Sequence, residues 1–174
     1  MWCVGNYKKN SQKNIQVHGI DVLEASIEIA KEFNKTETNS FEIRDLMKNQ
    51  FTPNSFDGII FLETIEHVEN PALFLKEFHR ILRPNGFIIL STPNATSLKN
   101  ILYAISYKNK NKQQQMIKEI SHEPKNTGTH LEHIFNWDFP TLVRLLDKCG
   151  FDVVEHEFAR SGPIIIPIFG KKYN

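Results

Sequence analysis

Two short apolar runs on either side of an amphipathic stretch constrain this chain more than any other feature of its sequence. The runs are FDGIIFL at residues 56–62 and FIILST at residues 87–92. Near-continuous apolar runs of this length are typical of strands that are buried on both faces of a parallel sheet. Two parallel strands need a crossover connection, which is usually a helix packed on the sheet. We therefore expect a helix between the two runs.

The stretch between the runs carries the signals of such a helix. Asn70 can cap its first turn, and Pro71 suits the first helical position. Apolar residues then recur with the helical period of 3.6, at Phe74, Phe78, Ile81 and Leu82. The sequence RPNG at 83–86 ends the helix, and Gly86 is the residue expected to take the positive φ of the turn.

The same alternation of strand and helix extends over most of the chain. Strands are expected at 15–20, 40–46 and 151–158, with helices at 23–33 and between Asp138 and Gly150. This order predicts an α/β fold, a Rossmann-like three-layer sandwich with a mainly parallel sheet. With 174 residues we expect one domain over 1–174, interrupted at about 95–129 by an insertion or lid. Residues 108–115, KNKNKQQQ, lack apolar periodicity and are expected to be a mobile, solvated loop.

Charge and cysteine content narrow the classes of partner. Lysine and arginine number 21 against 20 acidic residues, so no chain-wide basic field favours nucleic acid or an anionic membrane. A small molecule is the expected partner. The two cysteines, Cys3 and Cys149, lack the spacing of a disulfide framework, which favours a reducing, cytoplasmic location. No apolar run is long enough to span a membrane, and the oligomeric state is left open.

Acidic residues follow three of the expected strands: Asp21, Asp45 and Glu63. In sheets of this kind ligands bind at the carboxyl ends of the strands. A carboxylate placed there can accept hydrogen bonds from both hydroxyls of a ribose, which is the expected role of Asp21. Asp45, one strand later, could accept from an adenine amino group. The alternative is that each acid caps the next helix or faces water.

At these residues the chain resembles the class I S-adenosylmethionine-dependent methyltransferases, in particular the small-molecule branch that includes the ubiquinone-pathway O-methyltransferases. The resemblance runs through HGID, RDL, FDGIIFLETIEHVENPALFLKEFHRILRPNGFIILSTPN and LVRLLDKCGFDVVE, within residues 15–94 and 129–158. It implies S-adenosylmethionine as cofactor, with the ribose at Asp21 and its neighbour Val22. It also implies adenine at Asp45 and Leu46, and a cofactor cleft lined by Glu63.

The front of the chain departs from that family. Its members begin with a strand and a loop of the form acidic-x-G-x-G-x-G, whose glycines let the backbone approach the cofactor. This chain has only CVGNY at 3–7, so Gly5 is the one glycine offered to the cofactor. The resemblance therefore implies an N-terminally shortened domain whose first strand is missing. The end of the chain, residues 161–174, is likewise expected to lack the antiparallel last strand.

Histidines are the candidate bases for methyl transfer to a hydroxyl. We single out His67 and His133, with His130 as a further candidate, against the alternative that each is structural. Glu63, Glu66 and His67 would share one face of a helical turn and could hold a divalent ion. We favour no metal, because the same turn is common in the family without one.

Three functions stay open. We expect S-adenosylmethionine-dependent methyl transfer to a small molecule, with O-methylation ahead of N- or C-methylation. The first alternative is a noncatalytic methyltransferase-like domain, which the single glycine in residues 3–7 favours. The second is a nicotinamide-dependent oxidoreductase, which the absence of G-x-G-x-x-G disfavours. Phe135, Trp137 and Phe139 could wall an acceptor pocket or belong to the core.

Overall fold

The computed structural model describes residues 2–5, 15–34, 38–48, 50–122, 133–158 and 164–171. Its strands are β1 (Trp2–Gly5), β2 (Gln16–Asp21), β3 (Ser40–Ile43), β4 (Phe56–Leu62), β5 (Leu82–Thr92), β6 (Phe151–Val153), β7 (Glu157–Phe158) and β8 (Ile164–Lys171). Its helices are α1 (Glu24–Phe33), α2 (Pro71–Ile81), α3 (Leu98–Ser106), α4 (Lys110–His122) and α5 (Phe139–Lys148), with a 3₁₀ turn, η1, at Leu46–Lys48. None of the helices in these ranges is long and apolar enough to cross a membrane.

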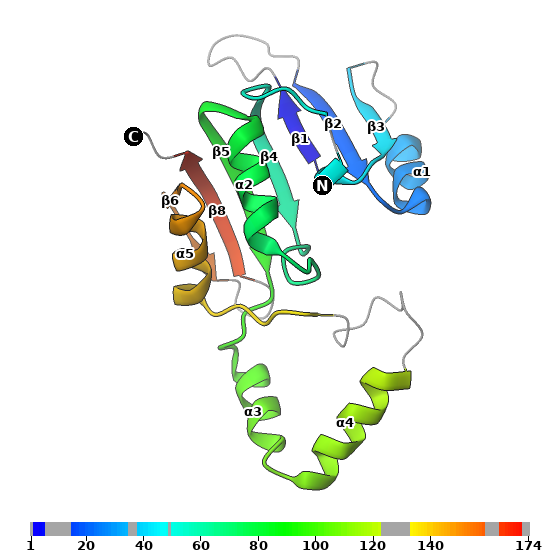
Figure 1. Cartoon of the computed structure of the whole chain (residues 1–174), viewed down its shortest axis with the longest axis vertical. Coiled ribbons are helices and arrows are strands. Elements are labelled where there is room, and N and C mark those ends of the chain that lie inside the picture. Colours follow the sequence, from blue (N-terminus) through cyan, green and yellow to red (C-terminus); the bar gives the residue numbers. More distant parts are fainter. Residues whose placement is uncertain are drawn as a thin grey trace.

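The strands form one sheet in the order β3-β2-β1-β4-β5-β8-β6, with β7 paired to β8 (Figure 1). Strands β2 and β3 pair in parallel, and so do β4 and β5. Strands β1 and β8 pair antiparallel with both of their neighbours in this order, so β2 to β6 all run in one direction. The expected Rossmann-like α/β fold with a mainly parallel sheet is confirmed.

The centre of the sheet differs from the expectation of a missing first strand. β1 lies between β2 and β4, where the resemblance places the first parallel strand, but it runs in the opposite direction. Its register opposes Gly5 to Gln16, at the amino end of β2. The position is therefore filled, and Gly5 is carried to the edge of the sheet away from Asp21.

The last strand is also present. β8 occupies the position between β5 and β6, where its antiparallel pairing completes the sheet. The expectation that residues 161–174 lack this strand is wrong. The strand predicted at 151–158 is divided into the short strands β6 and β7, which both pair with β8.

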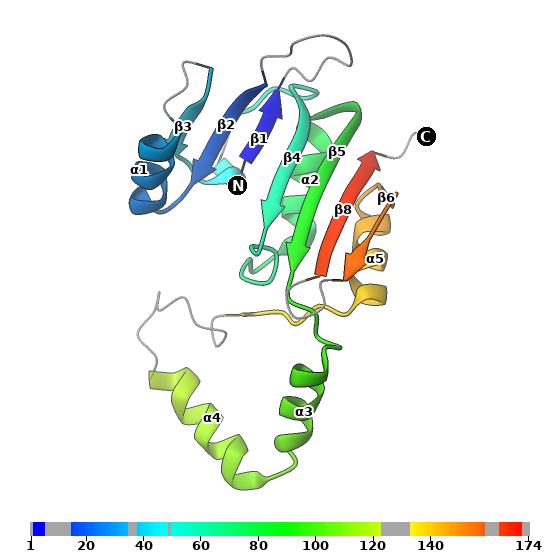
Figure 2. The same ribbon diagram turned by 180° about the vertical axis from the view of Figure 1, so that it is seen from behind.

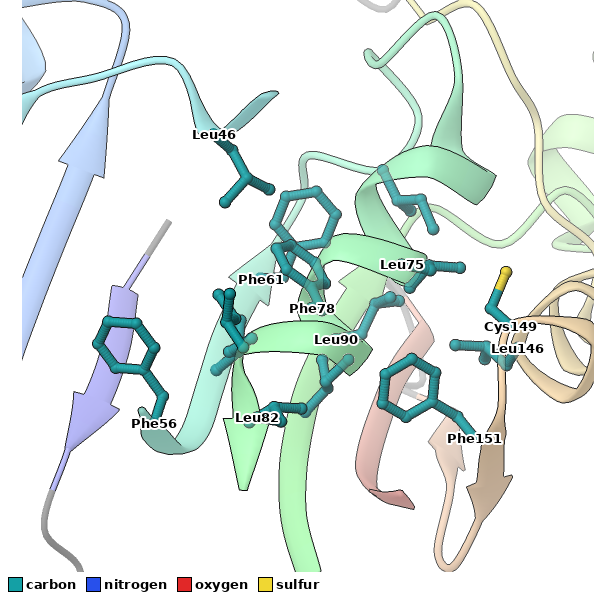
Figure 3. Packing of buried hydrophobic residues seen from close by; sticks show 14 of the residues in the cluster. Leu46, Phe56, Phe61, Leu75, Phe78, Leu82, Leu90, Leu146, Cys149 and Phe151 are labelled. Carbon is teal, nitrogen blue, oxygen red and sulfur yellow. The ribbon is translucent and has the colours of Figure 1, made fainter. Parts of the chain in front are cut away.

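One face of the sheet carries the main core (Figure 3). Ile59 and Phe61 of β4 and Leu90 of β5 pack there beneath α2 and α5. The helices contribute Leu75, Phe78, Ile81, Leu142 and Leu146, all of them fully buried. Each Å² of apolar surface buried on this face contributes about 25 cal/mol to the stability of the fold. The apolar residues whose spacing predicts α2 thus include residues that fill the core.

The opposite face is covered more sparsely. α1 packs Ile27 and Ala30 against Phe41 of β3, in a separate small cluster. Ile20 belongs to the main core, and its cross-strand partner Glu42 lies on the same face of the sheet. Side chains alternate between the two faces along a strand, so Phe41, the neighbour of Glu42 on β3, faces away from the main core. The prediction that residues 56–62 are buried on both faces is correct for the α2 face only, since Ile60 is only half-buried. Figure 2 shows β4 from the side opposite α2.

The ends of the helices explain the main turns. Asn70 accepts a hydrogen bond from the backbone N–H of Leu73, and Asp138 accepts one from Thr141, so both predicted caps are confirmed. Gly150 ends α5 with a φ of 89°. At RPNG the positive φ of 62° belongs to Asn85, not to Gly86 as predicted. Gly86 is required for space instead, since a Cβ there would lie 2.8 Å from the carbonyl oxygen of Arg83.

Helices α3 and α4 lie within the expected insertion, and α4 covers most of residues 108–115, where a polar, mobile loop is expected. Ser97 caps α3, and Asn109 precedes α4 and accepts a hydrogen bond from the N–H of Asn111. The prediction for 108–115 is wrong, because lysine and glutamine are good helix formers even without an apolar face to pack. In both views α3 and α4 project beyond the sheet as an open V (Figures 1 and 2).

Candidate functional site

The three predicted acids lie along one edge of the sheet, at the carboxyl ends of parallel strands. Asp21 is the last residue of β2, and its carbonyl oxygen accepts a hydrogen bond from the N–H of Arg44 beyond β3. Asp45 follows directly, and Glu63 follows the end of β4. Strands lie about 4.8 Å apart, so β2 and β4, with β1 between them, are roughly 10 Å apart. The edge can therefore accommodate an extended small molecule.

Local hydrogen bonds distinguish the two aspartates from one another. Oδ1 of Asp21 accepts the N–H of Leu23 at 2.9 Å, before α1 begins, and that helix has no side-chain cap. Oδ1 of Asp45 accepts the N–H of Met47 at 2.9 Å, inside the turn η1. The capping alternative thus applies to Asp45 and not to Asp21. Both carboxylates are half-buried, and the second oxygen of Asp21 can accept from a ligand. Oδ2 of Asp45 lies 3.8 Å from the ammonium group of Lys48, so a ligand there would share that oxygen with an ion pair.

The residues beside the aspartates have different environments. Val22 is 65% exposed at this edge, so its side chain is accessible to a ligand. Leu46 is buried in the main core, where it packs under the sheet edge (Figure 3). Leu46 therefore fixes the turn that carries Asp45, and contact of its side chain with an adenine ring is not a feature of this arrangement.

Glu63 has an unusual backbone conformation. Its φ is 46°, in the left-handed region that residues other than glycine and asparagine seldom adopt. Its N–H donates to the carbonyl oxygen of Ser91 at 3.0 Å, and its carboxylate accepts the Ser91 hydroxyl at 2.6 Å. Backbone strain of this kind persists where neighbouring contacts enforce it, and it is frequent at binding sites. Ser91 thereby holds the turn that follows β4.

The two candidate histidines come together at the same edge. The rings of His67 and His133 are in edge-to-face contact, with centroids 4.7 Å apart. The carbonyl oxygen of Glu66 accepts the N–H groups of Ile134 and Phe135, which fixes the segment before α5 against the turn after β4. His67 is exposed and His133 is half-buried, so a ligand at the edge can reach the pair. His130 lies outside the described residues.

Glu66 is a buried acid beside this histidine pair. Its side chain is 1% exposed, and Oε2 accepts the hydroxyl of Thr92 at 2.9 Å. Oε1 is buried without a hydrogen-bond partner among the described residues. Burial raises the pKa of the Glu66 carboxyl, against the opposing effect of hydrogen bonds to its carboxylate. The acid can therefore hold a proton more readily than an exposed glutamate.

Glu66, His67 and His133 could also hold a cation. Each offers one ligand atom, and these atoms lie within 4.8 Å of one another. One carboxylate with two imidazoles suits Zn²⁺ or Mn²⁺. This set differs from the predicted one, because residues 63–69 form a turn and not a helix, and the Glu63 carboxylate bonds to Ser91. His133 takes the place expected for Glu63.

The pKa of Glu66 predicts a pH-dependent stability. The folded chain binds this proton more tightly than the unfolded chain, so the stabilising effect is present at low pH and is lost as pH rises through the folded-state pKa. Glu66→Gln removes the ionisation and keeps an acceptor for Thr92. We expect its melting temperature to exceed that of the wild type by a few degrees at pH 7.5, with the difference shrinking toward pH 4.5.

The matched control for this measurement is Glu69→Gln, which changes an exposed glutamate three residues away. Its melting temperature should follow that of the wild type across the same pH range. A Glu66→Gln difference that does not change with pH, or a wild type that is the more stable protein at pH 7.5, would contradict the assignment.

Other predicted site residues lie elsewhere. Gly5 is at the amino edge of the sheet, opposite Asp21. A hollow of about 240 Å³ lies at that amino edge too, lined by Gln16, His18, Ser40, Phe51, Ser55, Phe56 and Arg83. Trp137 is buried in the main core, and Phe135 stacks on it, so the core alternative holds for Trp137. Phe139 lies against His156.

Sequence reasoning did not single out Ser91 and Thr92. Both are buried at the carboxyl end of β5, and they hold Glu63 and Glu66 respectively. The available signal is their position, because the two hydroxyls end an apolar strand at the same edge of the sheet as the turn ETIEH (residues 63–67) that follows β4. The register between β4 and β5 brings these two hydroxyls into contact with the turn that follows β4.

Comparison with known proteins places this arrangement in a family. A family model described as a methyltransferase domain matches residues 5–156. A ubiquinone biosynthesis O-methyltransferase from Pseudomonas aeruginosa is 32% identical over 98 residues, 55% of this chain and 42% of that protein. The protein of the same description from Neisseria meningitidis is 30% identical over 147 residues, 80% of this chain and 55% of that protein. The chain thus spans about half the length of these curated relatives.

Solved structures share the fold. A SAM-dependent methyltransferase from Methanosarcina mazei matches with a TM-score of 0.58 and 19% identity, over 90% of this chain and 82% of that one. The cyclase SpnF matches with a TM-score of 0.58 and 17% identity, over 82% of this chain and 44% of that one. At such identities the likeness concerns the fold, which is able to host more than one chemistry.

Proposed function

The chain belongs to the methyltransferase domain family, and from this premise we propose that it transfers a methyl group from S-adenosylmethionine to a small molecule. The observation that carries the proposal is the line of acids and histidines at the carboxyl edge of the sheet, where ligands bind in this fold. Relatives named as O-methyltransferases favour an oxygen as the acceptor atom. We propose that the acceptor is a small compound with a hydroxyl group.

The residues at the edge fit the nucleoside part of S-adenosylmethionine. Asp21 presents a carboxylate at the end of β2 that does not cap a helix, which suits two ribose hydroxyls. Asp45 stands beside it for the adenine amino group, and Val22, next to Asp21 in sequence, offers exposed apolar surface. The methionine part has no comparable fit among the described residues, because β1 is antiparallel and brings Gly5 to the other edge.

The bound cofactor would supply an electrophilic methyl group, and the chain's own residues would orient the acceptor and take its proton. We assign acceptance of this proton to His67 and His133, since their rings meet at an accessible point of the same edge. The backbone of Glu66 holds the turn after β4 against the segment before α5, and Thr92 orients the Glu66 carboxylate. Alignment of the acceptor by such a fixed frame accounts for much of the acceleration in transfers of this kind.

A noncatalytic methyltransferase-like domain is the alternative that the structure favours next. Its support is the antiparallel β1, which replaces the strand and glycine loop of the family's usual cofactor site. The two alternatives differ in cofactor binding, so binding is the property to measure.

Calorimetric titration with S-adenosylmethionine and with S-adenosylhomocysteine tests the proposal. We expect saturable heat from both ligands, with the homocysteine product competing for the same site. NADH serves as a control ligand for the oxidoreductase alternative and should give no heat. Absence of heat from both sulfur ligands at millimolar concentration would overturn the proposal in favour of the noncatalytic domain.

A further inference from the structure

Three side chains at the amino edge of the sheet form a chain of hydrogen bonds that the proposed function does not use. The Ser40 hydroxyl lies 2.6 Å from Nδ1 of His18, and Nε2 of the same ring lies 2.8 Å from the Glu42 carboxylate. A hydroxyl, an imidazole and a carboxylate linked in this order are the parts of an activated nucleophile. We propose that Ser40 is the nucleophile of a second active site, which hydrolyses esters of small carboxylic acids.

The pairing of β2 with β3 places these side chains on one face of the sheet. The register sets His18 opposite Ser40, and Ile20 opposite Glu42. Residues two apart along a strand share a face, so Ser40 lies directly across from the histidine and Glu42 lies diagonally across from it. The chain of hydrogen bonds is therefore assembled by two neighbouring strands of the sheet.

The partners of the His18 ring decide which of its nitrogens carries the hydrogen. An ionised carboxylate only accepts hydrogen bonds, so Nε2, which faces Glu42, is the nitrogen that donates. In the neutral imidazole Nδ1 then accepts, and the Ser40 hydroxyl donates to it. The two nitrogens are exchanged relative to the Ser-His-Asp triad, but the roles of donor and acceptor are the same. His18 is thus placed to take the proton of Ser40.

The imidazole and the carboxylate are each held by further contacts. Nε of Arg44 lies 2.7 Å from Oε1 of Glu42, and Nη2 donates to Oε2 at 2.9 Å. The hydrogen bond from Arg44 lowers the pKa of the Glu42 carboxyl, and the bond from His18 lowers it further, against the effect of burial. The His18 ring meets Phe51 edge-to-face and stacks with Phe56, with centroids 5.5 and 6.4 Å apart. Glu42 is therefore a positioning residue that stays ionised.

The amino-edge hollow lies directly beside the nucleophile, since Ser40 is one of the residues that line it. Its volume of about 240 Å³ is below the roughly 300–1,000 Å³ of pockets for drug-sized ligands, which limits the substrate to a short acyl group. Phe51 gives it an apolar wall, whereas Gln16 and Arg83 bring N–H groups that can stabilise an oxyanion. A guanidinium has five N–H groups, and Arg83 donates one of them to Asp57.

The reaction runs in two steps, with water as the co-reactant. Nδ1 of His18 takes the proton as Oγ of Ser40 bonds to the carbonyl carbon of the ester, and that proton passes to the departing alcohol as its C–O bond breaks. Water then attacks the acyl-serine and gives a proton to Nδ1. The carboxylic acid leaves as Oγ of Ser40 recovers the proton, and Glu42 stabilises the imidazolium in both steps.

The hydrolytic site and the nucleoside site lie at opposite edges of the sheet. Gln16 and Asp21 are the first and last residues of β2, five residues apart. At about 3.3 Å per residue the two sites are roughly 16 Å from one another. Ester hydrolysis can therefore be measured without S-adenosylmethionine, and its outcome is independent of the proposed methyl transfer.

Labelling with diisopropyl fluorophosphate tests the proposal, because this reagent phosphorylates serines that a neighbouring base activates. We expect the full chain to gain one diisopropylphosphoryl group, which peptide mass spectrometry should locate at Ser40. Ser40→Ala should not be labelled, and His18→Ala should be labelled about 100-fold more slowly. With p-nitrophenyl acetate as the substrate, both variants should lose about 100-fold or more in kcat/KM.

Glu42→Gln separates a role in hydrolysis from a role in strand pairing. It keeps an oxygen that can accept the N–H of His18 and removes the charge that stabilises the imidazolium. We expect kcat for p-nitrophenyl acetate to fall about tenfold or more, with KM within about twofold of the wild type. A lower melting temperature with unchanged kcat would assign the hydrogen bonds to strand pairing alone and overturn the proposal.

Matched controls remove the same groups elsewhere in the chain. Ser106→Ala deletes a hydroxyl that donates to the carbonyl oxygen of Tyr103, and His156→Ala deletes an exposed histidine. Both should be labelled and should hydrolyse the ester within about twofold of the wild type. No labelling of the wild type at millimolar reagent, labelling that persists in Ser40→Ala, or equal labelling rates in the wild type and His18→Ala would overturn the proposal.

Discussion

Replacing Asp21 with alanine is expected to weaken binding of S-adenosylhomocysteine about a hundredfold or more in calorimetric titration. The reason is the loss of a carboxylate at the end of β2 that is assigned two hydrogen bonds to ribose hydroxyls. Hydrogen bonds to a charged group contribute about 1.5–3 kcal/mol each, and 1.4 kcal/mol corresponds to a tenfold change in affinity. The fold should persist, because Asp21 is half-buried and contributes no side chain to the core.

Two further variants separate the ribose contact from local structure. Asp21→Asn keeps an oxygen that can accept the N–H of Leu23, so the turn before α1 stays intact while the charge is lost. It should bind the ligand more weakly than the wild type and more tightly than Asp21→Ala. Glu24→Ala removes an exposed acid three residues away and should leave affinity unchanged. An Asp21→Ala variant with wild-type affinity and a wild-type melting temperature would remove Asp21 from the site.

Replacing His133 with alanine is expected to lower turnover by about 10²- to 10⁴-fold, the range that general base catalysis contributes. Affinity for S-adenosylhomocysteine should stay within about twofold of the wild type, because His133 lies on the segment before α5 and not beside β2. Turnover is followed as release of the homocysteine product, using the hydroxyl compound that gives the highest rate with the wild type.

Two controls accompany the His133 measurement. His156→Ala changes an exposed histidine outside the cluster, between β6 and β7, and should leave turnover within about twofold. His67→Ala should lower turnover too, because the two rings are in contact. Equal turnover in the wild type and His133→Ala would show that the proton goes elsewhere, and a loss of cofactor affinity alone would indicate a binding role.

Much of the sheet could be predicted because its signals are local. The run at 56–62 coincides with β4, and Asn70 and Asp138 cap α2 and α5 as expected. Buried strands and capped amphipathic helices are specified by residues close together in sequence, so they can be predicted from one sequence. The position of Asp21 at a strand end follows from the same signals.

What could not be predicted depends on contacts between distant residues. Nothing in residues 2–5 specifies whether the strand they form runs parallel or antiparallel, which decides the edge that receives Gly5. The meeting of His67 and His133 depends on two backbone hydrogen bonds to Glu66 across the connection to α5. α4 escapes a search for apolar periods, because its helix rests on propensity and on Asn109.

The two aspartates show which features of a site can be predicted from a single sequence. Their placement on one edge follows from the strand pattern, whereas the difference between them follows from hydrogen bonds one or two residues away. Asp45 uses one oxygen in η1 and pairs with Lys48 through the other, whereas Asp21 uses one oxygen in a turn outside α1. A ligand at this edge would therefore depend more strongly on Asp21 than on Asp45.

A crystal structure of the chain with S-adenosylhomocysteine tests the central claim most directly. We expect the ribose hydroxyls within hydrogen-bond distance of the Asp21 carboxylate and the adenine beside Asp45, with the sulfur on the side of His67 and His133. A ligand bound at the amino edge, in the hollow lined by His18 and Arg83, would contradict it.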